Sequence, residues 1–210
     1  MNLREAGIGE GISEVIVTTQ SVSGVPNAAP IGIIAITSES GSNFFVRLYR
    51  GSKTLSNVQQ TGKLAANVTH DAVLFVKAAF EPLTESWFSL FHGFPVLKGA
   101  NSWILFDCTF REESSESGSF TFQLTPLAVR INRKEVRAIN RGLNAVIEAA
   151  IIATRNAIME GDERDRAERE RQMALYARIV EKCGGSREKE ALKILRERHA
   201  RCTCTGQIYE

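Results

Sequence analysis

A change in amino-acid usage near residue 130 most constrains what this 210-residue chain can fold into. Gly, Ser, Thr, Val and Phe dominate before it, and Arg, Glu, Ala and Leu dominate after it. From Arg130 onward the chain carries 18 Lys and Arg against 13 Asp and Glu, whereas the first 129 residues carry 8 against 11. The sequence therefore predicts two regions of different construction, residues 1–130 and residues 131–210.

Short runs typical of β-strands, separated by turn-forming residues, fill the first region. The intervals between them are too short for repeated strand-helix-strand units, which favours antiparallel pairing closed as a small barrel. One short helix is expected up to Gly62, with Ser52 or Thr54 as its cap. The predicted strands cover residues 14–20, 31–37, 43–48, 63–69, 103–112 and 119–132.

The second region has the spacing of amphipathic helices. Apolar residues at three- and four-residue steps from Val136 to Ile158 predict a helix with Asn132 as its N-cap, docked on the barrel or on a second subunit. Two more helices are expected over residues 163–183 and 187–200. The mixed charges of "GDERDRAERERQ" favour a solvated helix face over nucleic-acid binding, because no aromatic residues interleave with the basic ones.

Several classes of protein do not fit this sequence. No apolar run is long enough to span a membrane and no signal peptide is evident, so we expect a cytoplasmic protein without membrane association. Four scattered cysteines suit a reducing compartment, and Cys202 and Cys204 lack a second pair, so no metal site is expected. His70 and His92 lie in no hydrolytic-triad spacing.

The strand start "VPNAAPIGIIAI" carries almost no side-chain bulk between Asn27 and Gly32. Such a strand lets a flat ligand lie against the backbone, whose N–H and C=O groups can contact the edge of the ligand. Downstream, Arg47, Arg50 and Lys53 surround a Gly-Ser-Lys-Thr turn at a helix start, which favours a phosphate. The turn lacks the spacing of a nucleotide P-loop, and alone it is more typical of a capped surface helix.

Four segments together carry a resemblance: "VIVTTQSVSGVPNAAPIGIIAI", "FFVRLYRGSKTLSNVQQTGKLAANVTHDAVLF", "FPVLKGANSWILFDC" and "NRGLNAVIEAAIIATR". They resemble an uncharacterised prokaryotic family of FMN-binding split-barrel proteins related to flavin-reductase-like domains. The resemblance implies an α+β fold, an antiparallel split β-barrel with a C-terminal helical subdomain. It also implies a homodimer with FMN at the subunit interface.

The same resemblance implies roles for individual residues. The isoalloxazine ring would lie along the small-residue strand, the ribityl phosphate at the turn and helix start, and Asn67 near the ring or the ribityl chain. Phe94–Gly99 would approach the flavin from the partner subunit. The residues implied for cofactor binding are Asn27, Ala28, Ala29, Pro30, Ile31, Gly32, Arg47, Tyr49, Gly51, Ser52, Lys53, Thr54, Asn57 and Asn67.

The aromatic-rich segment at residues 77–94 departs from the family pattern. It forms either a lid over the flavin or packing in the core or a dimer interface, and packing is the simpler interpretation. The leading functional hypothesis is an FMN-dependent oxidoreductase that accepts hydride from a small-molecule donor such as NAD(P)H. The alternatives are a non-enzymatic flavin-binding or sensing module, and a barrel that uses a deazaflavin or haem.

Overall fold

The computed structural model of the chain describes residues 3–39, 41–158 and 163–205. Two compact units make up the chain. The barrel unit comprises residues 1–69 and 82–135, and the helical unit comprises residues 70–81 and 136–210. The helical unit therefore takes one short segment from the middle of the chain and the rest from its C-terminal part.

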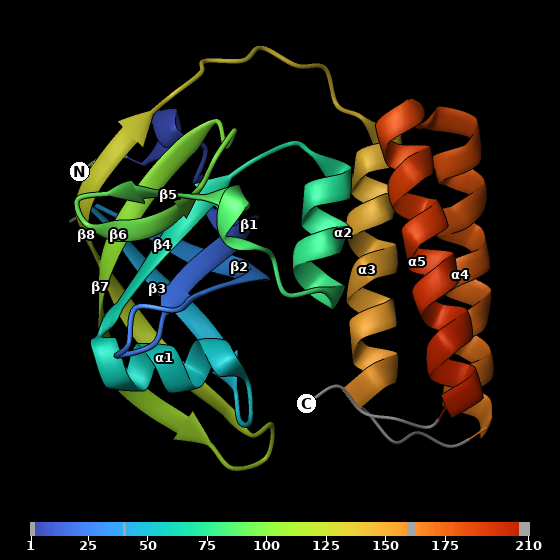
Figure 1. Cartoon of the computed structure of the whole chain (residues 1–210), viewed down its shortest axis with the longest axis horizontal. Helices are drawn as coiled ribbons and strands as arrows, with labels where there is room; N and C mark the ends of the chain where they lie inside the picture. The colour runs from blue at the N-terminus through green and yellow to red at the C-terminus, as the bar shows by residue number, and fades with distance from the viewer. Residues whose placement is uncertain (1–2, 40, 159–162, 206–210) are drawn as a thin grey trace. The chain divides into compact units, whose positions relative to one another are not determined.

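Six antiparallel strands close the barrel, in the spatial order β1-β2-β3-β8-β7-β4 (Figure 1). All six strands predicted from the sequence are present, with ends that differ by a few residues. Their bounds are β1 Gly11–Gln20, β2 Pro26–Ser38, β3 Gly41–Tyr49, β4 Lys63–Val68, β7 Ser102–Ser114 and β8 Ser119–Ile131.

Alternating side chains fill the barrel, as the period of two in a strand requires. On β3, Phe44, Val46 and Leu48 point into the core, whereas Arg47 and Tyr49 lie on the exposed face. The short helix α1 (Lys53–Thr61) follows β3 and lies across one end of the barrel (Figure 1). A 3₁₀ turn, η1 (Arg4–Ala6), precedes β1.

A second, two-stranded sheet occupies part of the aromatic-rich segment. After the 3₁₀ turn η2 (Glu85–Trp87), β5 (Phe88–Phe91) and β6 (Phe94–Leu97) form a hairpin whose turn is His92-Gly93. Both turn residues have positive φ, 48° and 75°, as the tightest hairpins need. Phe91 and Phe94 pack with Ala65, Leu105 and Trp103 in a second apolar cluster, separate from the barrel core. These two aromatic residues therefore pack within the protein, as the simpler interpretation expects.

Four helices form the helical unit: α2 (Ala72–Phe80), α3 (Arg141–Ile158), α4 (Glu163–Cys183) and α5 (Ser186–Thr205). They run side by side (Figure 1), and α3 contacts each of the other three. Its buried residues pack among these helices, which accounts for the apolar stripe; they are Ala145, Val146, Ala149, Ala150, Ile152 and Ala153. None of the helices in the described part of the chain has both the length and the apolar character needed to cross a bilayer.

The predicted start of the first long helix is wrong. Residues 133–140 are not helical, and α3 begins only at Arg141, where the Asn140 side chain accepts hydrogen bonds from the N–H groups of Gly142 and Leu143 at 2.9 and 3.2 Å. Asn132 instead ends β8: its backbone N–H donates to the Asn101 carbonyl at 2.8 Å, and its side chain donates to the Ala100 carbonyl at 3.1 Å. Val136 and Ile139 are consequently exposed.

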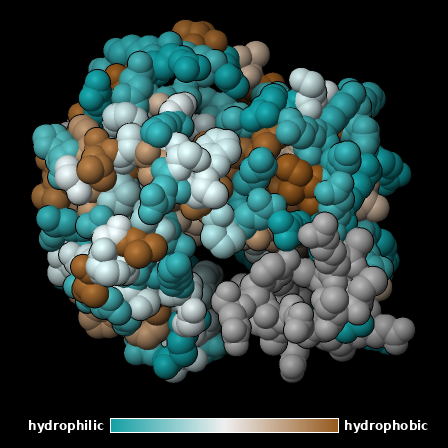
Figure 2. All heavy atoms as spheres, viewed as in Figure 1, coloured by the Kyte–Doolittle hydropathy of each residue, from teal (hydrophilic) through white to brown (hydrophobic). Residues whose placement is uncertain are grey.

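Hydrophilic residues cover most of the described helical surface on the face shown in Figure 2. The charged stretch predicted to be a solvated helix face is exposed at Arg164, Asp165 and Arg166, and it contains an ion pair of 3.6 Å between Arg171 and Glu168. That expectation is confirmed for these residues. The side chains of Cys202 and Cys204 lie outside the part that the structure describes.

Candidate functional site

Strands β2 and β3 are paired over only part of their length, so they separate at one end of the barrel. Strand β2 pairs with β1 from Pro26 to Ala35, but it pairs with β3 only from Ile33 to Ser38. Beyond that point β3 continues through Arg47 to Tyr49 with β8 alone as its neighbour. Residues 26–32, which we call the open half of β2, therefore have one strand partner, and the edge that faces away from β1 lies outside the ladder.

The open half of β2 contains all six small residues singled out in the sequence, and all of them are half-buried. Ile31 packs against the barrel core, so Asn27 and Ala29 lie on the same face of the strand, and Ala28, Pro30 and Gly32 lie on the other. With so little bulk, a planar group can approach the backbone closely, and the free edge offers donors and acceptors for it.

Gly32 has an additional, intramolecular reason to be small. A Cβ atom there would lie 2.7 Å from Cγ2 of Ile12 and 3.0 Å from Oε1 of Glu14, both on β1. Any larger residue would force these side chains to shift. At this one position the neighbouring strand, and not a ligand, explains the missing bulk.

The N-terminus of α1 lies beside the open half of β2. The Asn27 side chain donates to Oγ1 of Thr54 at 3.2 Å, and the Asn57 side chain donates to Oγ1 of Thr19 on β1 at 3.0 Å. Ser52 caps the helix by accepting from the N–H of Leu55 at 3.2 Å. The first-turn N–H groups have no acceptor within the helix and carry the positive end of its dipole.

The turn into α1 brings unpaired positive charge to this end of the helix. Gly51 makes the turn with φ 81°, a value that favours glycine. Arg47 and Lys53 are exposed, and among the described residues neither side chain has a hydrogen-bond or ion-pair partner. Arg50, by contrast, pairs with Glu113, and its guanidinium carbon lies 5.5 Å from the centre of the Phe120 ring. Two of the three cations around the turn are thus available to an anion.

Asn67 differs from the other predicted site residues because it is fully buried. Its Nδ2 donates to the Ile16 carbonyl at 2.9 Å and to Oγ1 of Thr18 at 3.0 Å, and its Oδ1 accepts from the N–H of Leu97 at 2.7 Å. These bonds join β4 to β1 and to β6, so they give Asn67 a structural role. Its contact with a cofactor stays a prediction.

Sequence reasoning missed the part that β6 plays on the outside of the barrel. Thr18 is fully buried and donates to the Pro95 carbonyl at 2.6 Å, which fastens β6 to β1. Phe94–Leu97 are all buried in their own chain, while Lys98 and Gly99 are exposed. Only these last two residues of the predicted partner-facing segment present an accessible surface.

Two hollows in the barrel unit lie apart from the open half of β2. One of about 250 Å³ is lined by the turn after β6 and the chain after β8, and it includes Trp103. The other, of about 350 Å³, is lined by aromatic residues and includes Cys108, whose pKa is raised to about 12 by burial and, less, by Asp107. Within the described residues, no three His, Cys, Asp or Glu side chains gather as a metal site.

Comparison with known proteins identifies the family. Residues 13–133 match the N-terminal domain of the family described as protein of unknown function DUF447, and residues 140–197 match its second domain. The chain belongs to this family. The resemblance to an uncharacterised protein family that was inferred from the sequence is therefore confirmed.

One DUF447 protein has a crystal structure with FMN bound. This protein, from Methanosarcina mazei, is 38% identical to the present chain, and the match covers 94% of this chain and 100% of that one with a TM-score of 0.82. A split-barrel protein of the flavin reductase type from Shewanella frigidimarina matches 63% of this chain and 75% of its own at 12% identity, with a TM-score of 0.51. The second match shows the fold alone. The predicted α+β fold, an antiparallel split barrel with a C-terminal helical subdomain, is confirmed.

Proposed function

We propose that the protein is an FMN-binding flavoprotein of the flavin-reductase-like type. One combination carries this proposal: an open strand edge of small residues lies beside a helix N-terminus with two unpaired cations, in a chain 38% identical to an FMN-bound protein. A flat ring and a phosphate are the two groups that such a site accommodates, and FMN carries both.

The residues present fit the phosphate of FMN. A phosphate ester at neutral pH carries close to two negative charges, which Arg47, Lys53 and the first-turn N–H groups of α1 can neutralise and bind. The hydroxyl groups of Ser52 and Thr54 are close to the same end of the helix. Because Thr54 is bonded to Asn27, the phosphate site and the strand for the ring are held together.

The proposed ring contacts are made by the open half of β2. Its free backbone edge would orient the ring by hydrogen bonds, and its small side chains would exclude water while the ring lies against them. Bound FMN supplies the electron-transfer chemistry itself. The proposed site comprises Asn27, Ala28, Ala29, Pro30, Ile31, Gly32, Arg47, Tyr49, Gly51, Ser52, Lys53, Thr54 and Asn57, and Asn67 supports it by joining β4 to β1 and β6.

A homodimer with FMN at the subunit interface completes the proposal. In a single chain, residues 26–32 are only half-buried and Tyr49 is 59% exposed. A flavin here would keep much of its surface in water unless a second subunit covered it. The proposed activity is oxidation of a small-molecule electron donor such as NAD(P)H at the flavin.

The first test is the visible absorption spectrum of the purified protein, followed by release and identification of the chromophore. An oxidised flavin spectrum with FMN recovered on denaturation supports the proposal, and NAD(P)H oxidation is then assayed. Bound FMN without NAD(P)H oxidation would favour a binding or sensing module. A deazaflavin, a haem or failure to take up added FMN would overturn FMN as the cofactor.

A second test addresses the phosphate contacts. Lys53→Ala and Arg47→Ala should each weaken FMN binding by about 1–3 kcal/mol, as expected for a charge-assisted hydrogen bond. Lys63→Ala and Arg111→Ala are matched controls, because both residues are exposed and lie on other strands of the barrel. If fluorescence titration gives the same affinity for all four variants, the phosphate does not bind at α1.

A further inference from the structure

The hollow of about 250 Å³ in the barrel unit, which we call the Trp103 pocket, shares no residue with the proposed FMN site. It lies between the β5–β6 hairpin, the turn after β6, the start of β7 and the chain that follows β8. Its lining residues are Ser89, Lys98, Gly99, Ala100, Trp103, Asn132 and Arg133.

The walls of the Trp103 pocket are held in place by hydrogen bonds of the chain itself. The backbone N–H groups of Asn132 and Arg133 both donate to the Asn101 carbonyl, at 2.8 and 3.0 Å. The indole N–H of Trp103 donates to the Leu97 carbonyl at 2.9 Å, which fixes the orientation of the ring. The pocket is therefore formed before any ligand arrives.

Positive charge surrounds this pocket. Lys98 uses one of the three N–H groups of its ammonium in a bond of 2.9 Å to the Ser86 carbonyl. Arg130 lies over Trp103, with its guanidinium carbon 5.6 Å from the ring centre. In the described part of the chain, the guanidinium groups of Arg130 and Arg133 have no hydrogen-bond or ion-pair partner.

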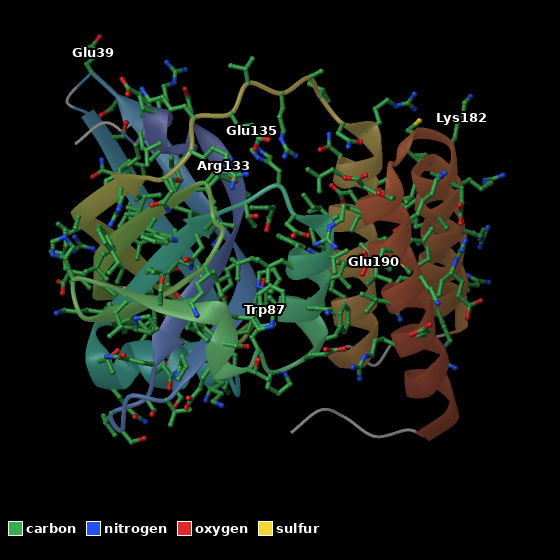
Figure 3. All side chains as sticks on the ribbon, turned by 45° about the horizontal axis from the view of Figure 1, so that its top comes forward. Glu39, Trp87, Arg133, Glu135, Lys182 and Glu190 are labelled. Carbon is green, nitrogen blue, oxygen red and sulfur yellow. The ribbon has the colours of Figure 1, made fainter. Side chains whose placement is uncertain are left out.

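Two carboxylates that contact the pocket segments or the chain after β8 already have partners. Glu135 accepts a hydrogen bond of 2.8 Å from the Asn101 side chain, and Glu5 pairs with Lys134 at 3.4 Å. Figure 3 labels Arg133 and Glu135 on the segment that follows β8. Lys98 and Arg133 thus remain available to an external anion at the rim of a pocket with one indole wall.

We propose that the Trp103 pocket binds a phosphate monoester that carries an aromatic ring, such as a nucleoside monophosphate. The phosphate lies between Lys98 and Arg133, where two charge-assisted bonds are possible. The ring contacts the part of Trp103 that lines the pocket, beside Arg130 and Phe91, which lie 5.6 and 5.8 Å from the centre of the indole ring. The hydroxyl of Ser89 and the amide of Asn132 bound the remaining space. Lys98 and Gly99 also belong to the segment that the resemblance places toward the partner's flavin, so AMP binding to the FMN-loaded protein is what separates this site from the FMN site.

The test is binding of AMP to the purified protein with excess FMN present, measured by calorimetry and by the indole N–H resonance of Trp103 in nuclear magnetic resonance spectra. Trp87→Phe assigns that resonance, because the chain has two tryptophans. We expect AMP to shift the Trp103 resonance, and adenosine and inorganic phosphate each to bind at least tenfold more weakly. Equal binding of AMP and phosphate, or no shift of Trp103, would overturn the proposal.

Variants assign the phosphate contacts. Lys98→Ala and Arg133→Ala should each lower AMP affinity about tenfold, the effect of one lost hydrogen bond to a charged group. Lys134→Ala is the matched control, since it removes a neighbouring charge that is paired with Glu5. Should Arg133→Ala impair folding, Arg133→Gln and the loss of AMP affinity with added salt supply the same information. If Lys134→Ala lowered AMP affinity as much as Arg133→Ala, binding would depend on the net charge of the surface and not on a defined site, which would overturn the proposal.

Discussion

The barrel unit and the helical unit bury different kinds of side chain. Among the described residues, the barrel unit buries seven polar ones, whereas the helical unit buries only Glu188. The seven are Thr18, Thr19, Thr54, Asn57, Asn67, Ser102 and Ser119. The buried apolar residues described in the helical unit are seven alanines, eight larger aliphatic residues and Phe75.

This difference matches what each unit has to position. Buried hydrogen bonds are directional, so Asn57 and Asn67 fix individual strands and one helix around the open half of β2. Helices that pack through small residues need close approach but few directed bonds. The barrel unit thus uses directed hydrogen bonds to position the residues of the proposed site, whereas the helical unit is held together mainly by close packing.

The strongest test of this contrast removes the amide of Asn67. Asn67→Ala should lower the free energy of unfolding of the barrel by about 2–4 kcal/mol, because the N–H of Leu97 and the carbonyl of Ile16 lose a buried partner. The measurement is urea unfolding followed by the fluorescence of the two tryptophans, both of which lie in the barrel unit. Asn43→Ala, at an exposed position of β3, is the control and should change stability by under about 0.5 kcal/mol. Equal effects of the two variants would show that the buried bonds do not hold the barrel.

The corresponding test for the helical unit adds a methyl group where Gly142 and Gly184 lie in close contact. A Cβ at Gly142 would lie 2.5 Å from Cα of Gly184, so Gly142→Ala should destabilise the unit by about 1–3 kcal/mol through overpacking. Helix propensity alone would stabilise this variant by about 1 kcal/mol, so the sign of the change decides between the two effects. Circular dichroism at 222 nm reports the melting of the helices. Gly9→Ala is the control, because nothing lies within 4 Å of its added Cβ.

A third test, with a smaller expected change in stability, compares two roles of Asp71 in the helical unit: the N-cap of α2 and the ion pair with Arg187. Oδ1 of Asp71 accepts from the N–H groups of Val73 and Leu74 at 3.0 and 3.1 Å, and both carboxylate oxygens lie 2.7 Å from Arg187. Asp71→Ala should cost about 1–2 kcal/mol for the lost cap of α2. Arg187→Ala and Asp71→Asn should each cost under about 1 kcal/mol, because the pair is largely exposed and Asn still caps. Thermal melts in which Arg187→Ala matched Asp71→Ala would make the ion pair the dominant contact.

Much of the fold could be predicted because its signals are local. Turn residues mark the ends of the barrel strands, and the period of apolar residues marks the long helices. Helix α2 could not be found in this way, since six of its nine residues are buried and no polar face gives it a period. The start of α3 was misplaced because Val136 and Ile139 continue the helical spacing by chance, while tertiary bonds hold Asn132 at the end of β8.

The candidate site was likewise predictable only where its signals are local in the sequence. The lack of bulk from Asn27 to Gly32 and the turn before α1 are visible in the sequence. The burial of Asn67 was not, because it depends on Leu97, thirty residues away in the hairpin. The pairing of Arg50 with Glu113 likewise depends on strand register, which a single sequence does not fix.

The last test concerns Cys108, a titratable group of the barrel unit with a raised pKa. Burial, with a smaller contribution from Asp107, raises its pKa from 9.0 to about 12, so the folded state holds the proton more tightly than the unfolded chain does. The stability that this provides is complete below pH 9 and is lost as the pH rises toward 12. Iodoacetamide at pH 8.5 should therefore leave the Cys108 peptide unmodified until urea is added, since only the thiolate reacts. Cys108→Ala should flatten the alkaline loss of stability, and an unchanged slope would assign that loss to other groups.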